Sequence, residues 1–149
     1  LQETVDLFAP YAHHKGIVIA AAVDPSARAI VMADRLRLRQ VLINIVKNAV
    51  TYSDGGTIAI SARIEGATAE IRVSDAGVGI PAERIVTLMS SDSWEPHPSR
   101  TLDGGLGIGI SICRRLLRLM GGMLRLESAE GFGTTATIIM PVKAASAAA

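Results

Sequence analysis

Two asparagines four residues apart, Asn44 and Asn48, are the first residues in the chain whose spacing suggests chemistry. On a helix they share one face, opposite or lateral to the apolar stripe, and Gln40 and Thr51 extend that polar side. Carboxamide oxygens suit a hard cation such as Mg²⁺, which keeps most of its waters and takes few protein ligands. The pair therefore indicates a metal site, and the alternative is a solvated helix face on which neither residue acts.

An acid followed by two glycines forms the second candidate, the run Asp75-Ala76-Gly77-Val78-Gly79-Ile80 at the end of a predicted strand. Gly77 and Gly79 permit backbone angles and close approaches that other residues forbid. The carboxylate of Asp75 can accept a hydrogen bond from an exocyclic amine such as that of adenine. The alternative is an ordinary strand-ending turn, in which Asp and Gly are common.

The third candidate is the glycine-rich run from Gly104 to Gly109, which leads directly into a predicted helix. Backbone N–H groups at the positive end of a helix bind phosphate well. No parallel strand–turn–helix unit surrounds the run, which argues against a dinucleotide site. No Lys-Ser or Lys-Thr pair follows it either, which argues against a Walker A loop.

Hydrophobic periodicity predicts the elements that position these segments. Asp34 is the expected N-cap of one helix, and Pro81 the first residue of another. The expected helices are Leu1–His14, Asp34 to about Tyr52, a short one from Pro81, and Leu106–Met120. The expected strands are Ile17–Val23, Ala29–Met32, Thr57–Ile64, Ala69–Ser74, Met123–Glu127 and Thr134–Met140. These elements predict an α/β (α+β) two-layer sandwich, with a mixed, mostly antiparallel sheet packed on about three helices.

Composition narrows the class of protein. The 149 residues fit one domain, and a net charge of +1 with few aromatics argues against a nucleic-acid partner. Cys113 is the only cysteine, so no internal disulfide forms, and its apolar surroundings predict a buried, inert thiol. There is no signal peptide or apolar run of membrane-spanning length, so we expect a cytoplasmic domain. Because the chain begins at Leu1, we expect it to be part of a longer protein.

In this order and spacing, the segments resemble the ATP-binding catalytic domain of sensor histidine kinases. That domain belongs to the superfamily of gyrase, the heat-shock chaperone and the mismatch-repair ATPases. The resemblance extends over nearly the whole chain and implies a Bergerat-type ATP-binding fold over residues 1–142, an ATP lid at about 90–104 and a flexible tail at 143–149. Its matching residues are Asp34 to Leu42 in the stretch that leads into the asparagine box, Asn44, Asn48 and Ala49 in that box, Asp75, Gly77 and Gly79 in the first glycine box, Gly105 to Ile108 in the second, and Glu130, Gly131, Gly133, Thr134, Met140 and Pro141 in the closing hairpin.

By position, the resemblance implies that Asn48 holds the Mg²⁺ of an ATP–Mg²⁺ complex, and that Asn44 supports it or reaches the phosphates. It places Asp75 on the adenine amine, with Thr134 nearby through water and Tyr52 beside the base. Further nucleotide contacts are implied for Gly77, Gly79, Ile80, Gly105, Leu106 and Gly107.

The resemblance also implies which group receives the phosphate. Asn44 stands where gyrase-type ATPases have a water-activating glutamate, so an external acceptor and slow hydrolysis are expected. None of His13, His14 and His97 has the context of a phosphoacceptor. The acceptor is therefore expected on upstream dimerisation helices of the same protein, which would pass the phosphate to a response regulator. We expect this fragment to be monomeric and the parent protein to be a homodimer. A membrane anchor in the parent protein is compatible with this expectation.

Two departures from the family pattern leave an alternative open. Thr51 replaces a lysine that often reaches the phosphates, for which Lys47 or Arg100 could substitute. The run Val86-Thr87-Leu88-Met89 replaces the aromatic residues that anchor the lid. The alternative function is a catalytically weak or regulatory nucleotide-binding module.

Overall fold

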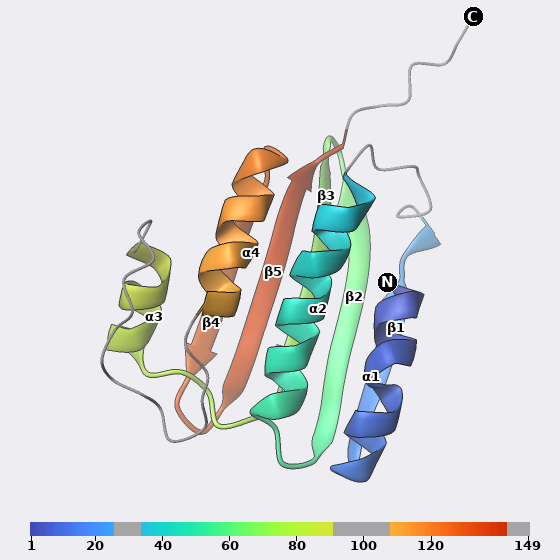
Figure 1. Cartoon of the computed structure of the whole chain (residues 1–149), viewed down its shortest axis with the longest axis vertical. Helices are drawn as coiled ribbons and strands as arrows, with labels where there is room; N and C mark the ends of the chain where they lie inside the picture. The colour runs from blue at the N-terminus through green and yellow to red at the C-terminus, as the bar shows by residue number, and fades with distance from the viewer. Residues whose placement is uncertain (26–33, 91–107, 143–149) are drawn as a thin grey trace, which may run out of the picture.

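The computed structural model describes residues 1–25, 34–90 and 108–142, which form two layers (Figure 1). One layer is a five-stranded sheet in the order β1-β2-β3-β5-β4. Helices α1, α2 and α4 cover one face of this sheet, and α3 lies beside α4 (Figure 1). The elements are α1 (Gln2–His14), β1 (Ile17–Val23), α2 (Arg35–Thr51), β2 (Gly56–Glu65), β3 (Thr68–Asp75), α3 (Ala82–Ser90), α4 (Ile108–Leu119), β4 (Met123–Ala129) and β5 (Gly133–Pro141).

Strand direction confirms the predicted mixed, mostly antiparallel sheet. Strands β2 and β3 form an antiparallel hairpin, β4 and β5 form another, and β3 joins the two by pairing antiparallel with β5. Only the pair of β1 and β2 is parallel among the described strands. Helix α2 connects β1 to β2, as parallel neighbours require a crossover.

Helix α2 forms where the sequence predicted it. The side chain of Asp34 accepts hydrogen bonds from the N–H groups of Leu36 and Arg37, at 3.0 and 3.1 Å, and so satisfies two donors that a helix start leaves unpaired. Glycines with positive φ, Gly55 and Gly56, follow its end. Its buried stripe is Val41, Leu42, Ile45, Val46, Ala49 and Val50.

The core lies between this stripe, the apolar face of α4 and the inward-facing residues of the sheet. It is made mainly of aliphatic side chains, as the low aromatic content predicted. Its most completely buried members include Val41, Val46, Ile58, Ile60, Leu117 and Ile138. Cys113 is fully buried among them, which confirms the predicted burial of its thiol.

Several predictions lie outside the described residues: the strand at Ala29–Met32, the lid, the glycine run up to Gly107, and the tail. Several element ends differ from the predicted ones by one or two residues, and among them α3 begins at Ala82 and not at Pro81. The carbonyl of Pro81 accepts from the N–H groups of Arg84 and Ile85, so Pro81 lies at the N-cap and not at the first helical position. None of the described helices is both long and apolar enough to span a membrane.

Candidate nucleotide-binding site

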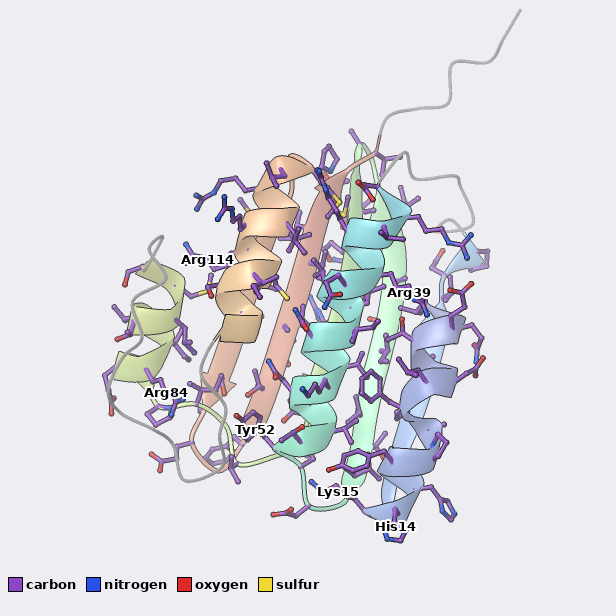
Figure 2. All side chains as sticks on the ribbon, in the orientation of Figure 1. His14, Lys15, Arg39, Tyr52, Arg84 and Arg114 are labelled. Carbon is purple, nitrogen blue, oxygen red and sulfur yellow. The ribbon has the colours of Figure 1, made fainter. Side chains whose placement is uncertain are left out.

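Three polar side chains lie in one row where strands β3, β5 and β4 meet the loops. Asp75, the last residue of β3, pairs with Thr134 of β5, and Thr134 pairs with Ser128 of β4. Directly paired residues of antiparallel strands project to the same face of the sheet. The row lies where these strands begin or end, at the same end of the sheet at which α2 ends at Tyr52 (Figures 1 and 2).

Asp75 is held so that its two carboxylate oxygens differ. Oδ1 accepts hydrogen bonds from the N–H of Gly77 at 2.9 Å and from the N–H of Thr134 at 3.2 Å. No hydrogen bond joins Oδ2 to any residue within the described ranges, so it is available to an outside donor. Burial raises the pKa of the Asp75 carboxyl, and the hydrogen bonds from Gly77 and Thr134 offset part of that shift. The arrangement suits one external N–H donor, such as an exocyclic amine.

The turn from Asp75 to Ile80 is fixed by close backbone approaches at its glycines. A Cβ added to Gly77 would collide with the carbonyl oxygen of Tyr52, and one added to Gly79 would collide with that of Ala129. Gly79 also has φ +71°, a conformation that favours glycine. The sequence predicted both properties for this turn without predicting the neighbours that require them.

Hydrogen bonds attach the same turn on both sides. The N–H of Val78 donates to the carbonyl of Tyr52 at 3.2 Å, and the N–H of Gly131 donates to the carbonyl of Val78 at 2.8 Å. The turn is thus tied to the end of α2 and to the loop between β4 and β5. Asp75 is positioned by both.

Ser128 lies in the candidate site, and the sequence did not single it out. Its Oγ accepts from the N–H of Ile80 at 2.8 Å, donates to the carbonyl of Gly133 at 2.7 Å, and lies 2.8 Å from Oγ1 of Thr134. A signal was present, because Ser128 continues the inward-facing alternation of Leu124 and Leu126. A polar residue on that apolar face needs partners, and here they belong to the site.

The two asparagines lie lateral to the buried stripe of α2, on the side facing α4. Oδ1 of Asn44 accepts from Nε2 of Gln40 at 3.2 Å, and the Asn44 side chain lies near Cys113, whose thiol donates to the carbonyl of Val41 at 3.7 Å. Burial raises the pKa of Cys113 to about 11, and the neighbouring Asn44 side chain partly opposes that shift. Asn44 is therefore committed to partners within the fold.

Asn48 differs from Asn44 in that its carboxamide has no hydrogen-bond partner in the part of the chain that is described. Gly109 of α4 lies near this side chain, because a Cβ added to Gly109 would be 3.9 Å from Nδ2 of Asn48. The side chain is half-buried and faces the beginning of α4. Among the described residues no cluster of three His, Cys, Asp or Glu side chains could hold a metal, so a cation here would depend on Asn48 and on ligand oxygens.

Two lysines, Lys47 and Lys15, lie near the end of α2 and differ in their contacts. Lys47 is exposed, as is the neighbouring Thr51. Lys15, which the sequence did not single out, donates from Nζ to the carbonyls of Val50 and Thr51 at 2.9 and 3.0 Å (Figure 2). Its ammonium group thus satisfies the last carbonyls of α2 and opposes the negative end of the helix dipole.

The structure therefore brings together most of the predicted binding residues. Asp75, Gly77, Gly79, Ile80, Tyr52 and Thr134 form one cluster, while Asn44, Asn48 and Lys47 line α2 beside it. Gly105, Leu106 and Gly107 lie outside the described residues.

Residues 33–144 match the family described as histidine kinase-, DNA gyrase B-, and HSP90-like ATPases. The chain belongs to this family. The matched range contains the asparagine pair, the Asp75 turn and the closing hairpin, which are the elements of the site described above.

Its curated relatives include sensor kinases of bacteria. The chain is 34% identical over 139 residues to the sensor protein GacS of Pseudomonas syringae, and 30% identical over 135 residues to the sensor histidine kinase RcsC of Escherichia coli. These matches take up 90% and 91% of the chain but only 15% and 14% of the relatives. The chain thus spans about one-seventh of the length of these kinases.

Solved structures agree with this family membership. Full-length ShkA in complex with AMPPNP matches with a TM-score of 0.80 and 31% identity, over 98% of this chain and 30% of ShkA. A nucleotide-free catalytic domain of the histidine kinase ThkA matches with a TM-score of 0.79 and 29% identity, over 95% of this chain and 90% of that domain. The mixed sheet with helices on one face is the fold of histidine kinase catalytic domains.

Proposed function

We propose that this chain is the ATP–Mg²⁺-binding catalytic domain of a sensor histidine kinase, and that it transfers the γ-phosphate to a histidine on dimerisation helices of the same protein. The observation that carries the proposal is the geometry of Asp75. One of its oxygens is fixed by two backbone N–H groups, and the other is available to a donor. The resemblance between this chain and kinases such as GacS and RcsC supports the choice of reaction.

Adenine is the base that this geometry favours. Its exocyclic amine donates hydrogen bonds, whereas guanine presents a carbonyl oxygen at the same ring position. An ionised carboxylate has no proton to donate and can only accept hydrogen bonds. Asp75 therefore attracts the amine of adenine and repels the carbonyl oxygen of guanine. Tyr52, whose main chain contacts the Asp75 turn, would lie beside the base.

Asn48 is the residue that we assign to the metal. Mg²⁺ keeps several waters and needs few protein oxygens beside those of the phosphates, which one available carboxamide can satisfy. When bound, Mg²⁺ would neutralise charge on the transferred phosphoryl group. Asn44 fits a supporting role, because its carboxamide oxygen already accepts a hydrogen bond from Gln40.

Phosphoryl transfer requires mainly that the γ-phosphate is positioned and that its charge is neutralised. The residues of this chain would provide both. Asn44 cannot remove a proton from water, so a second protein group should be the preferred acceptor. The longer relatives are consistent with other domains in the same protein, which would provide the acceptor histidine and hold two copies together. A response regulator would take the phosphate in the following step.

Calorimetric titration of the chain with ATP, in the presence and absence of Mg²⁺, tests the assignment. Asp75→Asn should abolish ATP binding. If the amide oxygen accepts from the backbone N–H groups, the amide NH₂ faces the amine of adenine, and if the side chain is rotated, the NH₂ faces the backbone N–H groups. Asn48→Ala should mainly remove the dependence of affinity on Mg²⁺. Equal affinity in the three proteins would refute the site assignment.

The second candidate function is a regulatory nucleotide-binding module that does not transfer phosphate. It is favoured by the exposed Thr51, which stands where related kinases often have a lysine, and by the aliphatic residues that end α3. Incubating the chain with its upstream helices and γ-labelled ATP distinguishes the two functions. Labelled phosphohistidine supports the kinase, and ATP binding without labelling supports the regulatory module.

A further inference from the structure

Ser128 makes three hydrogen bonds through a single hydroxyl oxygen, and only one assignment of protons satisfies them all. The N–H of Ile80 can only donate to Ser128, and the carbonyl of Gly133 can only accept from it. The one proton of Ser128 is therefore directed at Gly133. The third bond, to Thr134 at 2.8 Å, must then be donated by Oγ1 of Thr134.

This assignment fixes what Thr134 can offer to a ligand. Its hydroxyl proton points to Ser128, so only lone pairs remain on Oγ1. Thr134 is paired with Asp75 in the sheet and projects to the same face. Oδ2 of Asp75, the oxygen without a partner in the described part of the chain, is an acceptor as well. The two neighbouring groups thus present acceptors only.

We propose that Ser128 is a positioning residue for base selection. It orients the Thr134 hydroxyl as an acceptor, so that the site favours a purine with a 6-amino group over one with a 6-oxo group. The inference rests on the proposed nucleotide binding at Asp75. Ser128 does not touch the base itself and acts through Thr134.

The alternative role for Ser128 is purely structural, since it also holds the turn through Ile80 and the hairpin through Gly133. A structural role alone predicts that its loss weakens all nucleotides equally. A role in base selection predicts that the loss weakens discrimination, because a released Thr134 hydroxyl can rotate and donate to a 6-oxo group. The ratio of two affinities separates these effects.

The experiment compares ATP with inosine triphosphate (ITP) by calorimetry with Mg²⁺; ITP has a 6-oxo group and a protonated N1 where ATP has a 6-amino group and an unprotonated N1. In Ser128→Ala we expect the ATP-to-ITP affinity ratio to fall by about tenfold, the equivalent of one hydrogen bond. Ser128→Thr, which keeps a hydroxyl, should restore the ratio. Ser61→Ala, at an exposed position on β2, should leave it at the wild-type value.

Thr134→Val provides a second measurement that does not depend on the stability of the Ser128 variants. It removes the acceptor while Ser128 stays, so the ratio should fall, and adding Ser128→Ala should lower it no further. An unchanged ratio in Ser128→Ala or in Thr134→Val, with ATP still bound by the wild type, overturns this inference alone. Absence of ATP binding by the wild-type chain overturns the proposed function and this inference with it.

Discussion

Two glycines that lie close together in the fold, Gly79 and Gly131, allow the close packing of the Asp75 turn to be measured. Both have positive φ, +71° and +80°, so alanine would suffer similar backbone strain at either position. They differ in the space around them. A Cβ on Gly79 would collide with the carbonyl of Ala129, whereas a Cβ on Gly131 would meet nothing within 4 Å. The difference between the two alanine variants therefore isolates the close approach.

The expected magnitudes follow from these two terms. Left-handed strain costs about 1–2 kcal/mol in either variant. Gly79→Ala must also displace the Ala129 carbonyl, and overpacking of this kind costs about 1–3 kcal/mol more. With a urea dependence of about 2 kcal/mol per molar, the unfolding midpoint of Gly79→Ala should be about 0.5–1.5 M below that of Gly131→Ala.

Urea unfolding of both variants without nucleotide, followed by circular dichroism, measures this difference. Calorimetry with ATP then tests its consequence for the site. Gly79→Ala should lose affinity because the displaced turn carries Asp75, whereas Gly131→Ala should keep it. Equal midpoints, or a lower midpoint for Gly131→Ala, would refute the argument that contact with Ala129 requires a glycine at position 79.

Three further predictions concern single side chains. The N–H of Gly77 donates to Asp75, so its amide NMR shift should titrate with a midpoint above 3.8, and Asp75→Asn should remove the titration. Because that pKa is raised in the fold, the contribution of Asp75 to stability should fall as pH rises from about 3.8 through the raised value. Lys15→Met should lower the free energy of unfolding by about 1–2 kcal/mol, since it leaves the last carbonyls of α2 unpaired; Lys47→Met, at an exposed position, should change it by less than about 0.5 kcal/mol. Cys113, whose pKa is raised to about 11 by burial, should resist alkylation at pH 8 in the folded chain and react fully in denaturant.

The elements of the fold could be predicted because their signals are local. Alternation in β2 and β3 around the Glu65-Gly66 turn is enough to predict a hairpin, and the Asp34 cap is enough to start α2. The strand order could not be predicted in this way. Strand β5 lies between β3 and β4, so Asp75 pairs with Thr134 across 59 residues, and nothing within either segment specifies that pairing.

The site shows the same division between local and distant information. Asp75 and its glycines stand out because their residue types are unusual for a strand end. Ser128 and Lys15 do not, because their roles depend on partners 48 and 35 residues away: the N–H of Ile80 for Ser128 and the carbonyl of Val50 for Lys15. Serines and lysines are common in any chain, so only the contacts distinguish them.

Gly77 links this local and distant information. Its φ is not positive, so backbone conformation alone does not require a glycine there, and the requirement comes from the carbonyl of Tyr52 at the end of α2. The same carbonyl accepts the N–H of Val78. Since Asp75 is also bonded to β5 through Thr134, the carboxylate is positioned only when α2, β3 and β5 are assembled together. The proposed nucleotide binding at Asp75 therefore depends on the long-range packing of the domain, and a nucleotide that occupies the site should stabilise all three elements as one unit.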